Sequence, residues 1–290
     1  MTTTNQVKGL PKATFLLRAL QKGISLSVKA PCLQAKALKY LRWAFNNLEA
    51  LHQPGREREL LKAQLMFLSL RRDPILSSKF FDFPEVKKDL SKARDFLKGL
   101  EAQHEKESAQ KVTTGEILVD AKYIWLNAYY AEMECNLLDL NNTSKVLLMG
   151  GGAMPMTAVV YSRRFGANCD CLDIDNSANG LAKQVIAKTG LAHKIKVMAG
   201  NAIDFPLAGY DLIVVTNHCE PKTNVFQHIL ANADKGVKVI FRNPVGLGKL
   251  FYEEVLPQQY QGFTVLKKEA GGLLTASESV VLGKEKGGYI

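Results

Sequence analysis

A run of three glycines is the first feature of this sequence that could serve chemistry. In "KVLLMGGGAMPMT" an apolar segment leads into Gly150, Gly151 and Gly152, and Met154 and Pro155 follow. Glycine lets a backbone approach a ligand closely and adopt positive φ, and proline suits the first turn of a helix. A strand, a glycine turn and a helix in this order begin the nucleotide site of open α/β sheets. We therefore expect these residues to bind a nucleotide-like ligand.

Polar residues follow the next two apolar segments. The second segment ends in "CLDIDNSAN", where Asp173, or Asp175 as the second candidate, could accept hydrogen bonds from both ribose hydroxyls. A helix cap or turn acid is the alternative role for Asp173. The third segment ends in "MAGNAID", and there we expect Asn201, Ala202 and Asp204 to lie at the edge of an adenine ring. Together these positions predict a site for an adenosine-containing ligand.

The glycine turn also favours one class of adenosine ligand over another. Dinucleotides and S-adenosylmethionine bind to the same arrangement of strands, but the dinucleotide pattern G-x-G-x-x-G needs a small residue where this chain has Met154 and Pro155. Without that third glycine, the backbone of the turn does not allow a pyrophosphate to approach closely. S-adenosylmethionine is therefore the favoured ligand, and no metal is predicted to be required.

The elements that must position these residues change in character near Asn141 and Asn142. Before them, apolar residues recur at helical spacing in residues 32–52, 86–105 and 113–140. Pro84 suits the start of the second helix, and Thr113 or Thr114 the cap of the third. After them, strands alternate with helices, which implies a parallel sheet. The strands are expected at 145–150, 169–174, 195–200, 210–216, 237–242, 263–268 and 279–284, and the helices at 155–166, 177–190, 222–234 and 249–256.

This organisation predicts an α/β protein with two domains. Residues 1–139 form a helical N-terminal lid domain, and residues 140–290 form a Rossmann-like domain of the S-adenosylmethionine-dependent methyltransferase type. The two strands expected after residues 237–242 agree with the seven-stranded sheet of those methyltransferases. The lid would exclude water from the site.

Composition excludes several other classes of protein. Hydrophobic residues make up 47% of the chain, which supports a folded core, and no apolar run reaches the ~18 residues that span a membrane. The five cysteines fit no zinc pattern, and reduced thiols in the cytoplasm are expected. The net charge is +10. Because the basic residues of the N-terminal 50 are spread along helical segments, we expect a solvated face and no nucleic-acid or membrane partner.

Several motifs resemble the nicotianamine synthase family. "VLLMGGGAMPMTAVV" is similar to the family's G-S-G-P-L-P-L-T after an apolar strand, and "CLDIDNSAN" is similar to Y-D-I-D-x-S-A-N. "FRNPVGLGKLFY" aligns without gaps on R-S-A-H-G-A-R-A-F-L-Y, retaining Arg242, Gly246 and Tyr252, and "GLEAQH" resembles an L-E-A-H segment. The resemblance extends over residues 95–283. It includes bacterial and archaeal relatives that make metallophores such as staphylopine.

The resemblance implies an unusual transfer reaction. The family moves the 2-aminobutanoate group of S-adenosylmethionine, its co-substrate, to an amine and releases 5′-methylthioadenosine. Here the acceptor would be a small molecule, namely histidine, another amino acid or a second aminobutanoate unit, and the product a nicotianamine-like metallophore. A methyltransferase acting on a small molecule is the alternative. Asn201 stands where the family usually has Asp, while Val245 and Gly248 replace a histidine and an arginine of the plant enzymes. These changes leave the identity of the acceptor open. The oligomeric state is also open, with a homodimer as one alternative.

Catalytic roles are also implied by the resemblance. Glu101, in the segment that matches L-E-A-H, is expected to be the general base, with Glu105 and Glu107 as alternatives and a solvated helix face as the structural explanation. Tyr123 and Tyr129 are expected to orient a carboxylate or the base, although an aromatic stripe at this spacing could equally be core.

Substrate contacts are expected at the ends of two later strands. Arg242 could bind a substrate carboxylate, or form an interior salt bridge instead. His218, in "TNHCEP", could contact substrate, although a lone loop histidine often has no such role. The turn containing Met154, Pro155 and Met156 is expected to present the γ-carbon of the cofactor to the helical domain.

Overall fold

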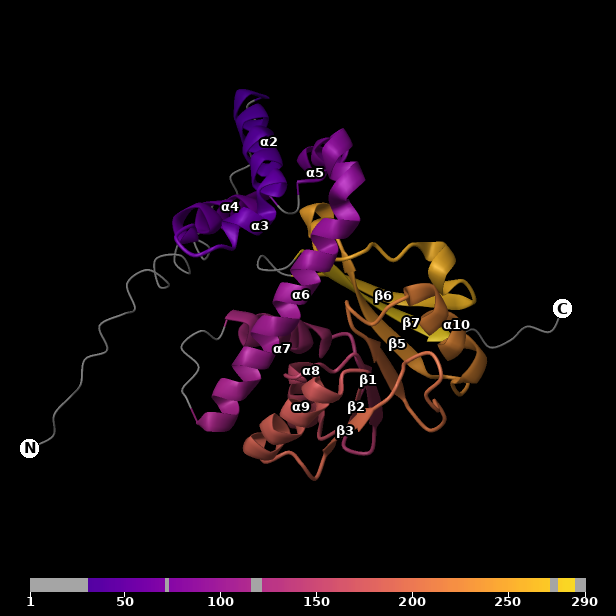
Figure 1. Ribbon diagram of the computed structural model, residues 1–290. Helices are drawn as coiled ribbons and strands as arrows, with labels where there is room; N and C mark the ends of the chain where they lie inside the picture. The colour runs from indigo at the N-terminus through magenta and orange to yellow at the C-terminus, as the bar shows by residue number, and fades with distance from the viewer. Residues whose placement is uncertain (1–30, 71–72, 116–121, 272–275, 285–290) are drawn as a thin grey trace, which may run out of the picture. The chain divides into compact units, whose positions relative to one another are not determined.

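The computed structural model describes residues 31–70, 73–115, 122–271 and 276–284, and the chain divides into two compact units, residues 1–70 and 71–290 (Figure 1). In the first unit the helices α2 (Pro31–Asn46), α3 (Leu48–Leu51) and α4 (Glu57–Leu70) pack against one another. The division between units lies well before the expected domain boundary at 139/140. The later helices belong to the same unit as the sheet, because they pack on it.

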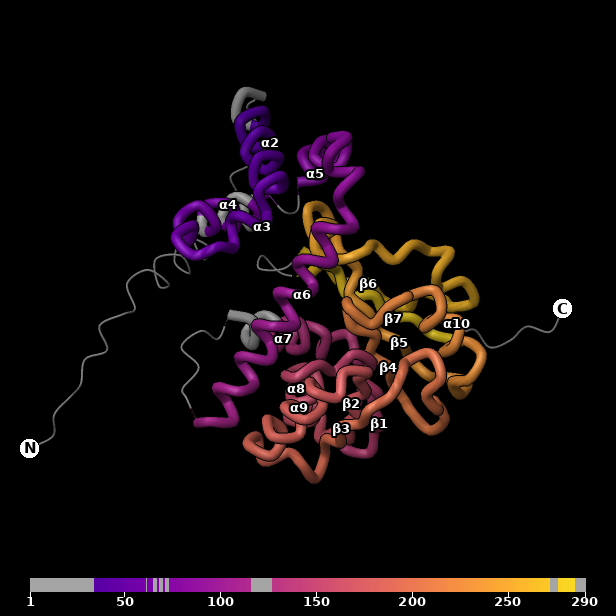
Figure 2. The backbone as a smooth tube through the Cα atoms, viewed as in Figure 1, coloured from indigo at the N-terminus to yellow at the C-terminus, as the bar shows by residue number. Residues whose placement is uncertain are grey.

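Among the described residues of the second unit, three helices precede the sheet, namely α5 (Pro74–Phe81), α6 (Pro84–Thr114) and α7 (Lys122–Glu134). Asp73 caps α5 by accepting a hydrogen bond from the Leu76 N–H at 2.9 Å. Helix α6 begins at Pro84 as predicted. Its backbone passes α9, against which it packs (Figure 2).

The predicted cap at Thr113 or Thr114 is wrong. Both threonines lie in the last turn of α6, where their hydroxyls donate to backbone carbonyls of the preceding turn. The helix ends at Gly115, which has φ of 82°. A glycine in the left-handed region ends a helix readily, and this signal outweighs the weaker capping preference of threonine.

The sheet has seven strands in the order β3-β2-β1-β4-β5-β7-β6 (Figure 1). Strands β1 to β5 are parallel, and β7 runs antiparallel between β5 and β6. All seven predicted strands are present: β1 (Lys145–Met149), β2 (Asn168–Asp173), β3 (Ile195–Ala199), β4 (Leu212–Val215), β5 (Lys238–Pro244), β6 (Phe263–Ala270) and β7 (Ser277–Lys284).

Helices cover both faces of the sheet, and alternate residues of each strand face opposite layers. Val146 and Leu148 of β1 pack with α7, α8 (Met156–Phe165) and α9 (Asn176–Thr189). Leu147 and Met149 pack instead with α10 (Lys222–Asn232) and η2 (Pro257–Tyr260). The central strands β1 and β4 are therefore buried on both faces, which leaves the carboxyl edge of the sheet as the place for a site. Among the described helices, none is long and apolar enough to cross a membrane.

The helix predicted at 249–256 is not formed. The chain makes a short 3₁₀-helix, η1 (Gly246–Leu250), and then a turn at Phe251 and Tyr252. Gly246 and Gly248 disfavour a regular α-helix. Gly248 also lies against the backbone of Ala276, and the Val245 N–H donates to the Ala276 carbonyl at 2.8 Å. This contact holds the segment close to the strand that follows.

Candidate functional site

The candidate site lies at the carboxyl edge of the sheet, where β1, β2 and β4 end. Helix α6 and η1 pack against each other above this edge. The Arg94 guanidinium of α6 donates to the Lys249 carbonyl of η1 at 3.0 Å from Nε and 2.6 Å from Nη2. This contact holds α6 and the segment after β5 together next to the loops that follow the strands.

The glycine turn is held by β2. The N–H groups of Gly150 and Gly151 both donate to the Leu172 carbonyl, at 2.8 and 3.0 Å. Gly150 and Gly152 have φ of 81° and 63°, values that other residues adopt only with strain. The Gly152 N–H donates to Asp173 Oδ2 at 2.8 Å. The turn and the acid are thus joined by a hydrogen bond.

Asp173 and Asp175 have different roles. Asp173 also accepts a hydrogen bond from the Asp175 N–H through Oδ1 at 2.9 Å, so it joins the turns after β1 and β2. Asp175 caps α9 by accepting from the Ser177 and Ala178 N–H groups. Hydrogen bonds from Lys106, at 2.6 Å, and from Ser177 lower the pKa of Asp175. The cap role considered for Asp173 therefore belongs to Asp175, and Asp173 is the better candidate for a ribose.

The expected adenine-edge residues lie in the turn after β3, next to the end of β2. The Gly200 N–H donates to the Asp173 carbonyl at 3.1 Å, which brings the two turns together. Asn201 is half-buried, and its side-chain oxygen accepts from the Ile203 N–H at 3.3 Å. Ala202 packs against the core, and Asp204 is exposed. An adenine contact by these residues remains a prediction.

The Met154 and Pro155 side chains lie in the interior, and the expected presentation of the γ-carbon by this turn stays a prediction. The Met154 side chain is 4% exposed and packs with Ala109, Ala178 and Val185. Pro155 is buried and precedes the first residue of α8. The backbone of the turn, and not the methionine side chain, therefore faces the site, because the apolar side chain gains more by packing between helices.

Glu105 lies against the glycine turn. Its Oε1 accepts a hydrogen bond from the Met154 N–H at 3.0 Å, and its carboxyl group occupies the space beside the Gly152 Cα. Burial raises the pKa of Glu105 to about 7; the hydrogen bond from Met154 opposes this rise, and the charges of Asp173 and Glu101 add to it. The sequence offered Glu105 only as an alternative base, and its place in the turn was not foreseen.

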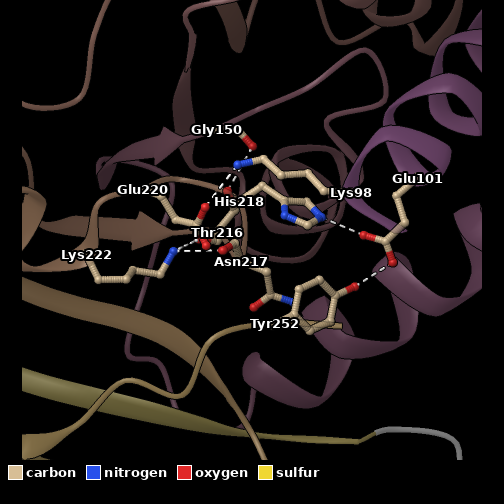
Figure 3. A network of polar contacts seen from close by, with 9 residues as sticks. All are labelled: Lys98, Glu101, Gly150, Thr216, Asn217, His218, Glu220, Lys222 and Tyr252. Atoms are coloured by element: carbon tan, nitrogen blue, oxygen red, sulfur yellow. Dashed lines mark hydrogen bonds and ion pairs between the residues drawn. The ribbon is translucent and has the colours of Figure 1, made fainter. Parts of the chain in front are cut away.

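Glu101 is held from two sides (Figure 3). His218 Nε2 lies 2.6 Å from Glu101 Oε2, and the Tyr252 hydroxyl donates to Glu101 Oε1 at 2.8 Å. A carboxylate only accepts, so the contact with His218 places a proton on Nε2. The side chains of Glu101 and His218 are 21% and 30% exposed, so solvent reaches this group. Glu107, the other alternative base, is exposed and accepts from Gln103.

Tyr252 was conspicuous in the sequence only as a residue shared with the family motif. Its partner Glu101 is 151 positions away, and His218 is 117 positions from Glu101. The His218 and Tyr252 rings lie 5.2 Å apart between their centroids. No local pattern could indicate this group, although the end of a parallel strand is where its histidine would be sought.

A buried lysine shapes the loop that carries His218. Lys222 is 5% exposed, and its Nζ donates to the carbonyls of Thr216, Asn217 and Cys219 at 2.7, 2.8 and 2.7 Å (Figure 3). Burial lowers the pKa of Lys222 to about 8. Lys98 of α6 pairs with Glu220 of the same loop at 2.9 Å. Lys222 thus holds the backbone of the loop, and the Lys98–Glu220 pair connects the loop to α6.

Arg242 forms the interior salt bridge considered as its alternative role. It is 8% exposed, and its Nε and Nη2 donate to the two oxygens of Glu134 at 2.7 and 2.9 Å. Tyr161 and Ser279 also donate to Glu134. The guanidinium lies 4.8 Å from the centre of the Tyr130 ring. Arg242 therefore serves the interior, and we do not propose it as a substrate ligand.

Of the two tyrosines predicted to orient a carboxylate or the base, only Tyr129 has a side chain among the described residues. Tyr123 lies in α7, but its side chain is outside the described residues. Tyr129 is half-buried on the same helix, which packs against α8. Their predicted role in orienting a carboxylate or the base therefore stays a prediction.

Ile174 is a further candidate that the sequence reasoning did not single out. Ile174, between Asp173 and Asp175, is 73% exposed, the largest exposure among the large hydrophobic residues that are described. An apolar residue that follows the ribose candidate at a strand end, and that no neighbour covers, suits the face of an aromatic base. Its position directly after a strand acid was the signal available in the sequence.

Comparison with known proteins agrees with this arrangement. The family described as "Nicotianamine synthase protein" matches residues 36–287. The chain belongs to this family. The match covers the glycine turn, the strand acids and the whole of α6.

Curated relatives carry a more specific name. The chain is 28% identical over 120 residues to an L-histidine 2-aminobutanoyltransferase of Yersinia pestis, which covers 41% of this chain and 45% of that protein. It is 26% identical over 133 residues to an enzyme of the same name from Pseudomonas aeruginosa, strain UCBPP-PA14, covering 46% and 51%. The matches thus span about half the length of these relatives.

Solved structures share the fold. A glutamate-to-glutamine variant of MtNAS in complex with S-adenosylmethionine has a TM-score of 0.72 and 20% identity, covering 85% of this chain and 97% of that one. MtNAS in complex with MTA and tNA has a TM-score of 0.70 and 20% identity, covering 85% and 96%. The α/β fold, with its seven-stranded Rossmann-like sheet, is therefore that of a nicotianamine synthase.

Proposed function

We propose that the protein transfers the 2-aminobutanoate group of S-adenosylmethionine to the amine of an amino-acid acceptor, in the biosynthesis of a nicotianamine-like metallophore. The single observation that supports this best is the Glu101 carboxylate, held by His218 and Tyr252 beside the glycine turn of a nicotianamine synthase fold. A proton acceptor in that place is what an amine nucleophile needs.

The residues at the edge of the sheet fit the proposed co-substrate. Asp173 offers carboxylate oxygens to ribose hydroxyls, and Ile174 offers an uncovered apolar surface to adenine. The side-chain oxygen of Asn217, after β4, is buried and has no partner among the described residues, so an acceptor for an N–H group is available there. When bound, S-adenosylmethionine supplies a sulfonium whose γ-carbon is electrophilic and whose neutral leaving group is 5′-methylthioadenosine.

Glu101 prepares the nucleophile. An amino acid is an ammonium near pH 7 and cannot attack until it loses a proton. The Glu101 carboxylate accepts that proton, and the nitrogen lone pair then forms the new N–C bond as the C–S bond breaks. The nitrogen keeps its two remaining protons and leaves as a secondary ammonium. The proton on Glu101 passes to solvent, which reaches this side chain.

His218 and Tyr252 act as positioning residues for Glu101. Each holds one carboxylate oxygen, so the free lone pairs of both oxygens point in fixed directions. Orientation matters because the attack must be in line with the breaking bond, and a displacement of about 1 Å can cost on the order of 100-fold in rate. The earlier expectation that His218 contacts substrate directly is replaced by this indirect role.

The acceptor is an amino acid, and histidine is the first to test because the matched segments of the relatives named above belong to enzymes that use it. The experiment uses S-adenosylmethionine labelled separately on its methyl and aminobutanoate carbons, with single amino acids as acceptors. We expect the aminobutanoate label in the product and the methyl label in 5′-methylthioadenosine. Methyl label on the acceptor, with S-adenosylhomocysteine, would instead identify a methyltransferase.

A further inference from the structure

Two carboxyl groups converge on one glycine of the turn. Asp173 Oδ2 accepts the Gly152 N–H at 2.8 Å, and the Glu105 carboxyl group lies beside the Cα of the same residue. A Cβ added to Gly152 would lie 2.6 Å from Glu105 Oε2, closer than any side chain tolerates. Only glycine therefore allows Glu105, from α6, to reach the turn.

The surroundings of Glu105 provide little to balance a negative charge. Glu101 precedes it by one helical turn, and Asp173 faces it from the end of β2; both oppose its ionisation. The N–H groups of Met154, at 3.0 Å, and of Ala153 are its favourable neighbours, and both are uncharged. Lys106 pairs with Asp175. Within the described part of the chain, neither Glu105 nor Asp173 forms an ion pair with a lysine or arginine.

This arrangement suits a positively charged ligand. Buried carboxylates are costly unless a cation or several donors compensate them, and such groups otherwise take up a proton. S-adenosylmethionine carries a sulfonium and an α-ammonium, both in its methionine part. A cation placed at this turn would supply the charge that the protein itself does not.

We propose that Glu105 binds the positively charged methionine part of S-adenosylmethionine, and that its carboxyl group releases a proton to solvent when the ligand binds. No covalent bond changes in this step: the carboxylic acid becomes a carboxylate, and the buffer takes the proton. The inference rests on the proposed co-substrate but not on which carbon of that molecule reacts.

The proposal makes the affinity depend on pH. With the pKa of Glu105 at about 7 in the free protein, about half of the molecules carry the proton at pH 7, so about half a proton should be released for each ligand bound. Below pH 7 the carboxyl must first ionise, and the affinity should fall by up to about tenfold for each unit of pH. Above pH 8 the contribution of Glu105 to the affinity should become constant.

Isothermal titration calorimetry tests the release directly. Binding of S-adenosylmethionine to the full chain at pH 7 is measured in phosphate and in Tris, whose ionisation enthalpies differ. We expect an apparent enthalpy that differs between the two buffers for the wild-type protein, and one that does not for Glu105→Gln. Glu107→Gln, two residues along the same helix and exposed, is the matched control and should behave as wild type.

A neutral ligand completes the design. 5′-Methylthioadenosine keeps the adenosine but lacks both positive groups, and we expect it to bind without release of protons. Release as large as that with S-adenosylmethionine would overturn the proposal, as would release that persists in Glu105→Gln. The wild-type titrations do not depend on the folding of a variant.

The outcomes also separate this inference from the proposed function. Tight binding of S-adenosylmethionine without proton release would overturn the role of Glu105 and leave the transfer reaction standing. Proton release with methyl transfer in the labelling experiment would overturn the reaction and leave Glu105 in place. Absence of any binding by the wild-type protein would overturn both.

Discussion

Single residues at the carboxyl edge differ in how firmly their partners hold them. Glu101 has a partner on each oxygen, whereas Glu105 is half-buried and accepts a hydrogen bond from the Met154 N–H. A proton acceptor that works repeatedly needs contact with solvent, and Glu101 has it. Glu105 instead has the negative charges of Asp173 and Glu101 nearby, so a positively charged ligand would favour its ionised form. We therefore assign different roles to two glutamates of α6: Glu101 accepts the proton of the amine, and Glu105 binds the positively charged part of the ligand.

The assignment of Glu101 can be tested by separating proton transfer from position. Glu101→Gln keeps the shape but not the basicity, and turnover should fall by about 10²–10⁴ while the affinity for S-adenosylmethionine stays close to that of the wild type. Single-turnover rates and calorimetry provide the two measurements. If both fall equally, Glu101 is structural.

His218 should behave differently because it acts through Glu101. His218→Ala should lower kcat by about 10- to 100-fold with KM for both substrates little changed. His218→Gln keeps an N–H donor and should restore much of the loss. A rise in KM for the acceptor that matches the fall in kcat would show direct contact with substrate instead.

Glu105 should leave a signature in stability. Its pKa in the folded protein is about 7, above the ordinary value of 4.5, so the folded state holds the proton more tightly than the unfolded chain. Stability relative to Glu105→Gln should therefore fall as the pH rises from about 4.5 to 7, by on the order of 2–3 kcal/mol, and stay constant above that range. Urea unfolding of both proteins without ligand, at several pH values, measures the difference. A difference independent of pH would contradict it.

At the scale of elements, the loop after β4 depends on one buried side chain. Lys222, in the first turn of α10, satisfies three carbonyls of the loop that carries His218. Lysine has three N–H donors, so one residue closes the whole loop. The shape of the loop is thereby set from the helix that follows it.

Removal of that ammonium should affect both stability and rate. Lys222→Met keeps the length of the side chain but leaves three carbonyls without their donor, and should destabilise the protein by about 2–5 kcal/mol. Turnover of the folded variant should also fall, because His218 loses its support. Lys235→Met, of an exposed lysine beyond α10, is the control for loss of charge. If Lys222→Met is as stable to urea as the wild-type protein, Lys222 does not hold the loop after β4.

Across the whole second unit, the Glu134–Arg242 pair connects elements that are distant in sequence. It joins α7 to β5, and the hydroxyls of Tyr161 in α8 and Ser279 in β7 complete it. A buried pair of this kind contributes most by its completeness, since either charge alone is costly.

Loss of one partner should therefore be worse than loss of both. Glu134→Ala should destabilise the protein by about 3–5 kcal/mol, and the double variant Glu134→Ala with Arg242→Met should recover part of it. Equilibrium urea unfolding measures the coupling. Additive effects would mean that the two charges do not depend on each other.

The sequence was sufficient for some of these features because they repeat locally. The seven strands and the helices between them follow from hydrophobic periodicity, and the glycine turn and Asp173 follow from their place at strand ends. The helix expected at 249–256 failed because Gly246 and Gly248, which precede it, and the contact of Gly248 with the distant backbone of Ala276 shape that segment. Partners such as Tyr252 for Glu101, or Glu134 for Arg242, lie more than 100 residues away and leave no local pattern.

Helix α6 has a consequence for which changes of length the chain can accept. Arg94, Lys98, Glu101 and Glu105 recur at steps of three and four, and each reaches a different part of the carboxyl edge. A residue inserted between Arg94 and Glu105 would turn everything beyond it by about 100° and advance it by about 1.5 Å. No single contact could then be kept without losing another. A substitution in α6 can therefore change one of these contacts by itself, whereas an insertion or a deletion changes several of them together.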